Sequence, residues 1–73
     1  MKIYVLMKQG NFGNEIVTVS TDINKIRKSI CEDFNAEEDY PTLSIWLNEE
    51  KIEEVSGNVV LYKIRDEIRL VEG

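Results

Sequence analysis

The sequence contains no histidine, a single cysteine (Cys31) and a single proline (Pro41). Histidine is the side chain that most readily exchanges a proton near neutral pH and a common metal ligand, so its absence removes the usual acid–base chemistry. One cysteine excludes an internal disulfide, and we expect Cys31 to be a small buried hydrophobic residue and not a nucleophile. We therefore expect a protein that is not an enzyme, with no cofactor and no metal site.

Long hydrophobic runs are also missing. The run near the start, Ile3 to Met7, is too short for the core of a signal peptide or for a membrane span. A lone cysteine also agrees with a reducing compartment. We expect a cytoplasmic protein that does not bind a membrane.

The length of 73 residues allows one small α+β domain, residues 1–73, with a modest core. The composition, 42% hydrophobic and 32% charged, is that of a globular protein. Small domains without disulfides or metals often gain stability by oligomerisation, and a homodimer is therefore one expected state.

The charge is distributed unevenly along the chain. Residues 32–54 hold nine carboxylates and one base, a charge of −8, whereas the other residues sum to +3. The calculated pI of the whole chain is 4.6. Because proteins that bind nucleic acids directly are generally basic, we expect no direct binding to DNA or RNA.

The spacing of apolar residues in the first half of the chain predicts two strands followed by a helix. Residues 3–7 are apolar on both faces, as in a central strand, and residues 15–19 are rich in β-branched side chains. With the Gly- and Asn-containing loop between them they predict a hairpin. In residues 23–35 the apolar side chains recur at steps of three and four, which predicts a helix capped by Thr21 or Asp22.

The second half of the chain predicts further strands. Residues 42–48 alternate with one buried face and Trp46 on the polar side, and residues 51–55 predict an edge strand. Residues 59–71 predict a final hairpin, although their apolar side chains also fit a helical stripe. The expected architecture is ββαββ plus a C-terminal hairpin, an antiparallel sheet with one helix on a face.

The acidic side chains and nearby aromatic residues define a candidate binding surface. The four carboxylates of residues 49–54 approach the linear charge density of one DNA strand. Binding hot spots are enriched in Trp and Tyr, which makes exposed aromatic residues candidate anchors, although burial of Trp46 in the core is an equal alternative. The candidate partner-binding residues are Phe12, Glu37, Glu38, Asp39, Tyr40, Trp46, Glu49, Glu50, Glu53 and Glu54.

Two segments, KIYVLMKQGNFGNEIVTVSTDINKI and YPTLSIWLNEEKIEE, together cover most of the chain. In their pattern they resemble a group of small proteins from low-GC Gram-positive bacteria and their phages. The chain is also similar in mode to small acidic phage proteins, anti-CRISPR proteins among them, that occupy the nucleic-acid-binding groove of a host enzyme. The resemblance identifies no individual functional residue.

These observations predict an acidic protein-binding module without enzymatic activity. The leading hypothesis is a phage-type inhibitor that binds a basic host protein, a nucleic-acid-binding enzyme, by DNA mimicry. The alternatives are an antitoxin-like or regulatory partner of a basic protein, and a small dimeric housekeeping domain whose charge serves solubility.

Overall fold

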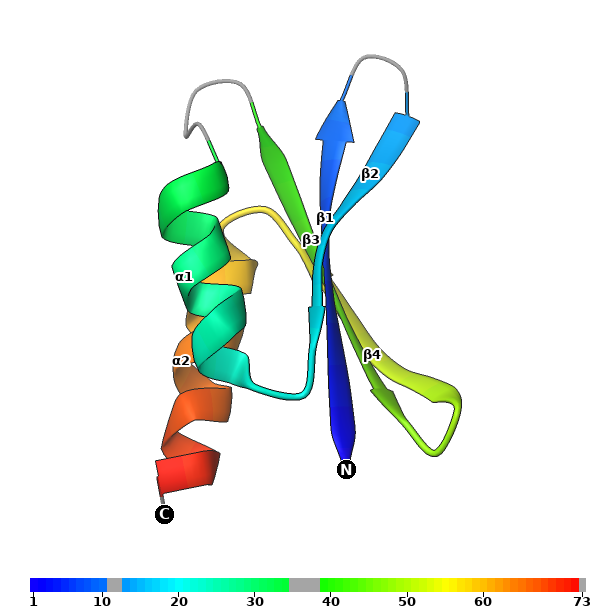
Figure 1. Cartoon of the computed structure of the whole chain (residues 1–73), viewed down its shortest axis with the longest axis vertical. Helices are drawn as coiled ribbons and strands as arrows, with labels where there is room; N and C mark the ends of the chain where they lie inside the picture. Colours follow the sequence, from blue (N-terminus) through cyan, green and yellow to red (C-terminus); the bar gives the residue numbers. More distant parts are fainter. Residues whose placement is uncertain (11–12, 35–38, 73) are drawn as a thin grey trace.

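Four antiparallel strands and two helices make up the computed structural model, which describes residues 1–10, 13–34 and 39–72. In chain order the elements are β1 (Lys2–Gly10), β2 (Gly13–Ser20), α1 (Ile23–Asp33), β3 (Tyr40–Leu47), β4 (Glu50–Ser56) and α2 (Val59–Glu72). The sheet order is β2-β1-β3-β4, so β1 is a central strand and β4 an edge strand, as the sequence predicted. Both helices lie on the same side of the sheet (Figure 1).

The first two strands form the predicted hairpin. Their register runs from Tyr4 opposite Ser20 to Gly10 opposite Gly13, with one irregularity between Leu6 and Met7. The strands are longer at both ends than the apolar pattern indicated, because backbone pairing continues past the last buried side chain. The two helices and the antiparallel pairing of all four strands confirm the predicted α+β class and antiparallel sheet.

Helix α1 follows the predicted apolar stripe. Its N-cap is Asp22, whose side chain accepts a hydrogen bond of 2.9 Å from the backbone N–H of Asn24. Ile23 and Ile26 are buried, and Ile30 and Phe34 pack against the same core. The stripe thus fixes which side of α1 rests on the sheet.

The predicted C-terminal hairpin is wrong, because residues 59–72 form helix α2. The turn before it leads into a helix, with the N–H of Val60 donating to the carbonyl of Gly57 at 3.1 Å. Val60 and Ile64 are buried and Ile68 packs against the core, which is the helical stripe. Burial of this stripe outweighs the weak strand preference of the β-branched residues that open the segment.

The core fills the space between the sheet and the two helices. Leu6 of β1 and Leu43 of β3 are completely buried, opposite each other in the sheet and facing the helices. Cys31, expected to be buried, is instead exposed, because it lies beside Ile30 on the outer side of α1. With both helices on one side of the sheet, no described element covers the other side.

Candidate protein-binding face

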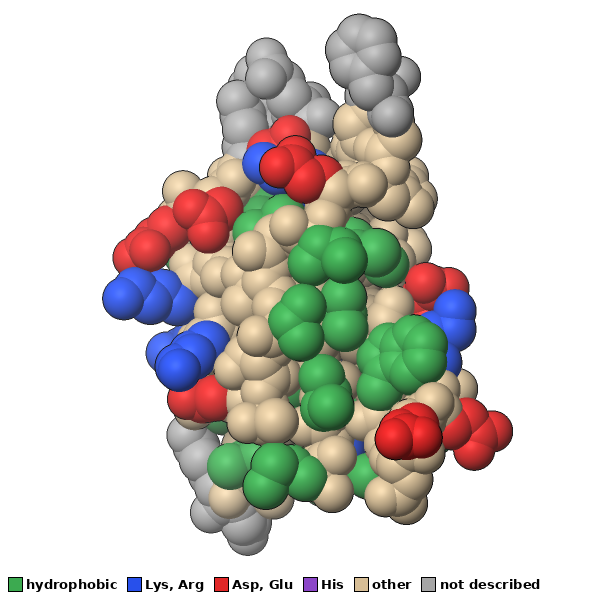
Figure 2. Space-filling view, turned by 45° about the vertical axis from the view of Figure 1, so that its right-hand side comes forward, with side chains coloured by type: hydrophobic (Ala, Val, Ile, Leu, Met, Phe, Trp, Pro, Cys, Tyr) green, Lys and Arg blue, Asp and Glu red, His purple; other side chains and the backbone are tan. Residues whose placement is uncertain are grey.

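The uncovered side of the sheet, here named the open face, follows from the strand register. Tyr4 and Leu6 point toward the helices, so the alternate residues of β1 and their partners in neighbouring strands point the other way. The open face consists of Ile3, Val5, Met7, Ile16, Val19, Thr42, Ser44, Trp46, Lys51, Glu54 and Ser56. Figure 2, turned toward the sheet, shows hydrophobic side chains gathered over it and charged ones at its margins.

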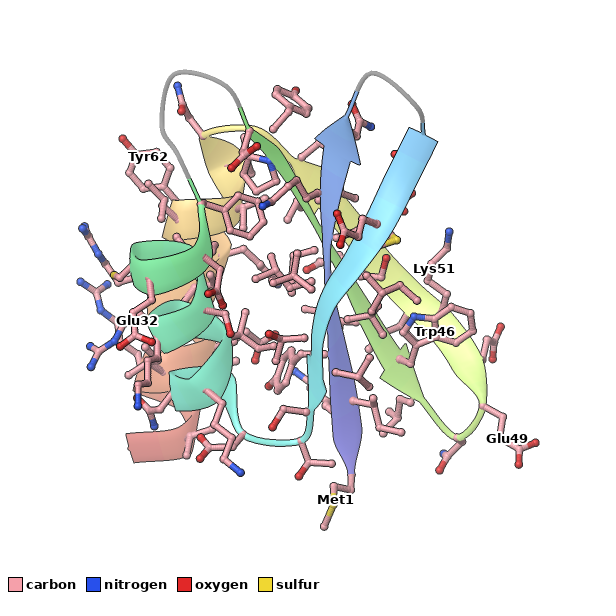
Figure 3. The ribbon with its side chains drawn as sticks, turned by 45° about the horizontal axis from the view of Figure 1, so that its top comes forward. Met1, Glu32, Trp46, Glu49, Lys51 and Tyr62 are labelled. Atoms are coloured by element: carbon pink, nitrogen blue, oxygen red, sulfur yellow. The ribbon has the colours of Figure 1, made fainter. Side chains whose placement is uncertain are left out.

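Trp46 lies on this face, as the alternation in β3 predicted, and it is half-buried. Its register partners are Ile3 on β1 and Lys51 on β4. Figure 3 shows Trp46 and Lys51 on the side of the sheet away from the helices, with Glu49 beyond them at the turn. The two alternatives for Trp46, core or exposed anchor, are thus replaced by an intermediate position: it packs on the sheet but stays accessible.

The open face carries almost no charge. Its one cation, Lys51, lies 3.5 Å from the carboxylate of Glu54, its one anion. Glu54 also accepts a hydrogen bond of 3.3 Å from the hydroxyl of Ser44. The hydroxyl groups of Thr42 and Ser56 are 3.2 Å apart and bond each other. The polar groups of the face are therefore largely paired within it, which leaves apolar atoms for a partner.

Large apolar side chains on the open face remain accessible. Ile16 is 62% exposed, Val19 58% and Ile3 42%, while Val5 and Met7 are half-buried. Depletion of charge around aromatic and aliphatic side chains is the composition of the central part of protein interfaces. The arrangement can bind a protein surface by apolar contact.

The predicted acidic residues of β4 do not form one surface. Because side chains alternate along a strand, Glu54 lies on the open face whereas Glu53 points toward the helices. There Glu53 forms an ion pair with Lys63 of α2. One carboxylate of this group thus stabilises the fold, and the predicted row of four is interrupted.

Glu49 and Glu50 lie at the β3–β4 turn. Leu47 pairs with Glu50, so the loop has two residues, Asn48 and Glu49, with φ of 53° and 68°. Positive φ at both positions is the pattern of a type I′ hairpin turn, in which glycine is strongly preferred at the second position. Glu49 holds an exposed carboxylate at the tip of the hairpin in a backbone conformation that glutamate disfavours.

Asp39 and Tyr40 lie at the other end of β3 from Trp46. Asp39 forms an ion pair of 3.4 Å with Lys8. Tyr40, 48% exposed, lies against Gly57, where an added Cβ would come within 2.9 Å of the tyrosine oxygen. Tyr40 and Trp46 are six residue steps apart along the strand, a distance of ~20 Å. The structure therefore does not unite them in one site. The remaining candidates, Phe12, Glu37 and Glu38, lie outside the described residues.

A buried ion cluster joins the sheet to α2, and sequence reasoning missed it. Glu67, only 2% exposed, receives hydrogen bonds of 3.1 Å at both carboxylate oxygens from the Lys2 ammonium. The hydroxyl of Tyr4 donates to it at 3.4 Å, and Lys63 lies 3.7 Å away. Its position one helical turn after Ile64 was the available signal. These contacts join β1 to α2 and hold the helix against the sheet.

Two pKa values in this cluster are displaced. Burial, together with the adjacent Glu67 carboxylate, raises the pKa of the Tyr4 phenol above its usual value of 10.0. The hydrogen bond and charge of Glu53, with a further contribution from Glu67, raise the pKa of Lys63 above 10.5, although burial opposes the shift. Both shifts favour the protonated groups, so at neutral pH Tyr4 is a neutral donor and Lys63 a cation.

The outer side of the helices has a different character. Arg27 of α1 and Arg65 and Arg69 of α2 line a shallow groove of about 470 Å³ between the helices. A second groove, of about 390 Å³, lies near Phe34 and Tyr40. Of the open-face residues, Ser56 lines the second groove, and Trp46 and the aliphatic residues line neither. These three arginines and the apolar open face lie on opposite sides of the sheet.

The chain matches no protein-family model, no curated protein and no solved structure. Of the two helices described, neither is long and apolar enough to cross a bilayer. Within residues 1–10, 13–34 and 39–72 there is no group of three or more acidic or cysteine side chains placed to hold a metal ion.

Proposed function

We propose that this protein is a binding module without enzymatic activity that contacts protein partners through the open face of its sheet. The observation that carries the proposal is the composition of that face. Nearly one third of the chain is charged, yet the open face holds one lysine and one glutamate that pair with each other. Around them lie aliphatic side chains and Trp46, in the pattern of a protein interface.

The shape of this surface favours a protein partner over a small molecule. Small molecules bind in concave pockets that bury most of the ligand. The two described grooves are lined mainly by residues near Phe34 and between the helices, and neither is lined by Trp46 or the aliphatic side chains of the open face. A broad sheet surface of this kind is suited to contact by another folded surface.

Trp46 is proposed as the anchor of the contact. It is half-buried, so the strand holds the indole in place while part of the ring remains free for a partner. An ordered aromatic side chain loses little conformational entropy on binding, which is why Trp is frequent among hot spots. The neighbouring Ile3 extends the apolar contact across the central strands.

The acidic turn at Glu49 and Glu50, at the margin of the open face, would attract a basic partner. Exposed carboxylates at an interface margin mainly accelerate association and add little affinity. This supports a basic protein as partner, as in the inhibitor and the regulatory or antitoxin-like hypotheses. Mimicry of a row of DNA phosphates would depend on these two turn residues, because Glu53 pairs with Lys63 and Glu54 with Lys51.

Site-specific photo-crosslinking tests the proposal. A photoreactive amino acid is placed either at Ile16 on the open face or at Tyr62 on α2, two positions of matched exposure, 62% and 64%. The labelled proteins are irradiated in a lysate of a Gram-positive bacterium, and covalent protein adducts are separated by mass. We expect several-fold more adduct from Ile16 than from Tyr62. Adducts from Tyr62 alone, or from neither position, would contradict the proposal.

A further inference from the structure

We infer that the open face is covered by a second copy of this chain, so that two sheets pack face to face between two outer layers of helices. The inference deepens the proposed function, on which it rests, by naming the partner of the open face. It concerns the interface alone and leaves the acidic turns at Glu49 outside it, where a further basic partner would approach.

Charge selects the open face for self-association. Each copy carries a net charge of −5, so two copies repel each other unless the contacting surfaces are close to neutral. Of the described residues on the open face, the charged side chains are Lys51 and Glu54, and they compensate each other at 3.5 Å. The face thus brings no uncompensated charge into an interface with an identical face.

The helical side does not meet this condition. It also exposes apolar side chains, Leu61 and Leu70 among them. Arg65 and Arg69 lie on the same helix and line the groove with Arg27. A symmetric contact through this side would bring both sets of arginines together, because in a two-fold dimer the same patch faces itself.

The available area suits a weak and reversible dimer. Strands ~4.8 Å apart with ~3.3 Å per residue give a sheet of four strands and about seven residues a flat area of roughly 450 Å². Two such flat faces bury about 900 Å², and projecting side chains add to this area. The value is close to the ~1,000 Å² expected of a specific interface. The dimer should therefore dissociate on dilution.

A second mode of self-association, pairing of the free edge of β2 with its own copy, predicts different sensitivities. The edge strand contributes Ile16 and Val19 to the open face, so changes there would affect both modes. Ile3 and Met7 belong to β1, which is paired on both sides. Substitutions at these two positions weaken contact between faces and leave an edge contact intact.

The test is sedimentation velocity over a wide range of protein concentration. Wild type is compared with Ile3→Lys, Met7→Lys and the control Leu70→Lys, a change at a position of α2 that is 69% exposed. Met7→Lys keeps an unbranched chain whose apolar stem can stay on the sheet, so it protects the test if Ile3→Lys does not fold. Thermal melts confirm that each variant is folded.

We expect a concentration-dependent dimer for wild type and Leu70→Lys, and a dissociation constant raised by ~100-fold or more in both β1 variants, because each brings two unpaired cations into the symmetric contact. A dimer insensitive to both β1 variants, or one broken by Leu70→Lys, overturns the inference. A wild type that stays monomeric at every concentration overturns it too, while the proposed function stands if Ile16 crosslinks to a different protein.

Discussion

The ammonium of Lys2 in β1 lies 3.1 Å from both carboxylate oxygens of Glu67 in α2, across 65 residues of chain. The contact ties the first strand to the last helix. The carboxylate is buried and has lost its water of hydration. Hydrogen bonds from Lys2 and Tyr4 replace that water. The Lys2–Glu67 contact fixes the position of α2 on one side of the sheet. The open face, on the other side, takes no part in it.

Removal of the buried carboxylate should destabilise the fold. Glu67→Ala leaves Lys2, Tyr4 and Lys63 without their common partner, and we expect the free energy of unfolding to fall by about 2–3 kcal/mol, with exposure of Lys2 moderating the loss. The exposed neighbour Asp66→Ala should change it by less than ~0.5 kcal/mol. Urea denaturation measures both, and equal effects of the two substitutions would show that the cluster does not hold α2.

Alkaline pH should weaken the same cluster. The pKa values of Tyr4 and Lys63 are raised in the folded protein, which therefore binds these protons more tightly than the unfolded chain does. The resulting stabilisation is complete below the ordinary values of 10.0 and 10.5 and is lost as the pH rises through the raised ones. Melting temperatures measured from neutral pH to above pH 10 should fall at the alkaline end, and less steeply for Tyr4→Phe. Parallel curves for the two proteins would argue against the Tyr4 contribution.

The β3–β4 turn should tolerate glycine at one position and not at the next. Glu49 has φ of 68°, so Glu49→Gly removes a backbone cost and should raise the free energy of unfolding by about 0.5–1 kcal/mol. Glu50 begins β4, where glycine gains nothing from its freedom, and Glu50→Gly should lower stability by a similar amount. Both changes remove one negative charge, so charge alone predicts the same sign for the two. Chemical denaturation decides between these outcomes.

Adjacent residues of β3 should separate stability from binding. Ile45 is 1% exposed on the helical side of the sheet, and Ile45→Ala should cost about 2–4 kcal/mol of folding stability. Trp46→Ala, on the open face, should cost only ~1–2 kcal/mol, because the half-buried ring loses fewer contacts. It should nevertheless abolish crosslinking from Ile16. A Trp46→Ala protein that is less stable than Ile45→Ala would mean that the indole serves the core.

Sequence reasoning succeeded where one local pattern decides the structure. The stripe of Ile23 and Ile26 predicted α1, and the alternation around Ile45 placed Trp46 on the opposite side of β3. It failed for α2, because Val59 and Val60 favour strands locally while burial of Val60 and Ile64 requires a helix. Glu67 was overlooked because a lone glutamate normally indicates solvent exposure.

The open face was not predictable for a related reason. Residues 3–7 are apolar on both sides, which indicates a strand buried on both sides. The structure gives β1 one buried side, formed by Tyr4 and Leu6, and one accessible side with Ile3. Which side is covered depends on where the two helices pack, and strand periodicity does not contain that information. Both sides of β1 are apolar, as its sequence indicates. The side that the helices do not cover is the candidate contact surface.

The most direct measurement of the central claim is the solvent accessibility of individual methyl groups by NMR, with a soluble paramagnetic probe. Spectra of the labelled protein are compared between dilute buffer and a concentrated bacterial lysate. If the open face is a contact surface, the methyl signals of Ile3, Met7 and Val19 are protected from the probe in at least one of the two conditions, by a second copy in buffer or by another protein in the lysate, whereas those of Leu61 and Leu70 on α2 stay accessible in both. Open-face methyl groups that remain as accessible as Leu70 under both conditions would contradict it.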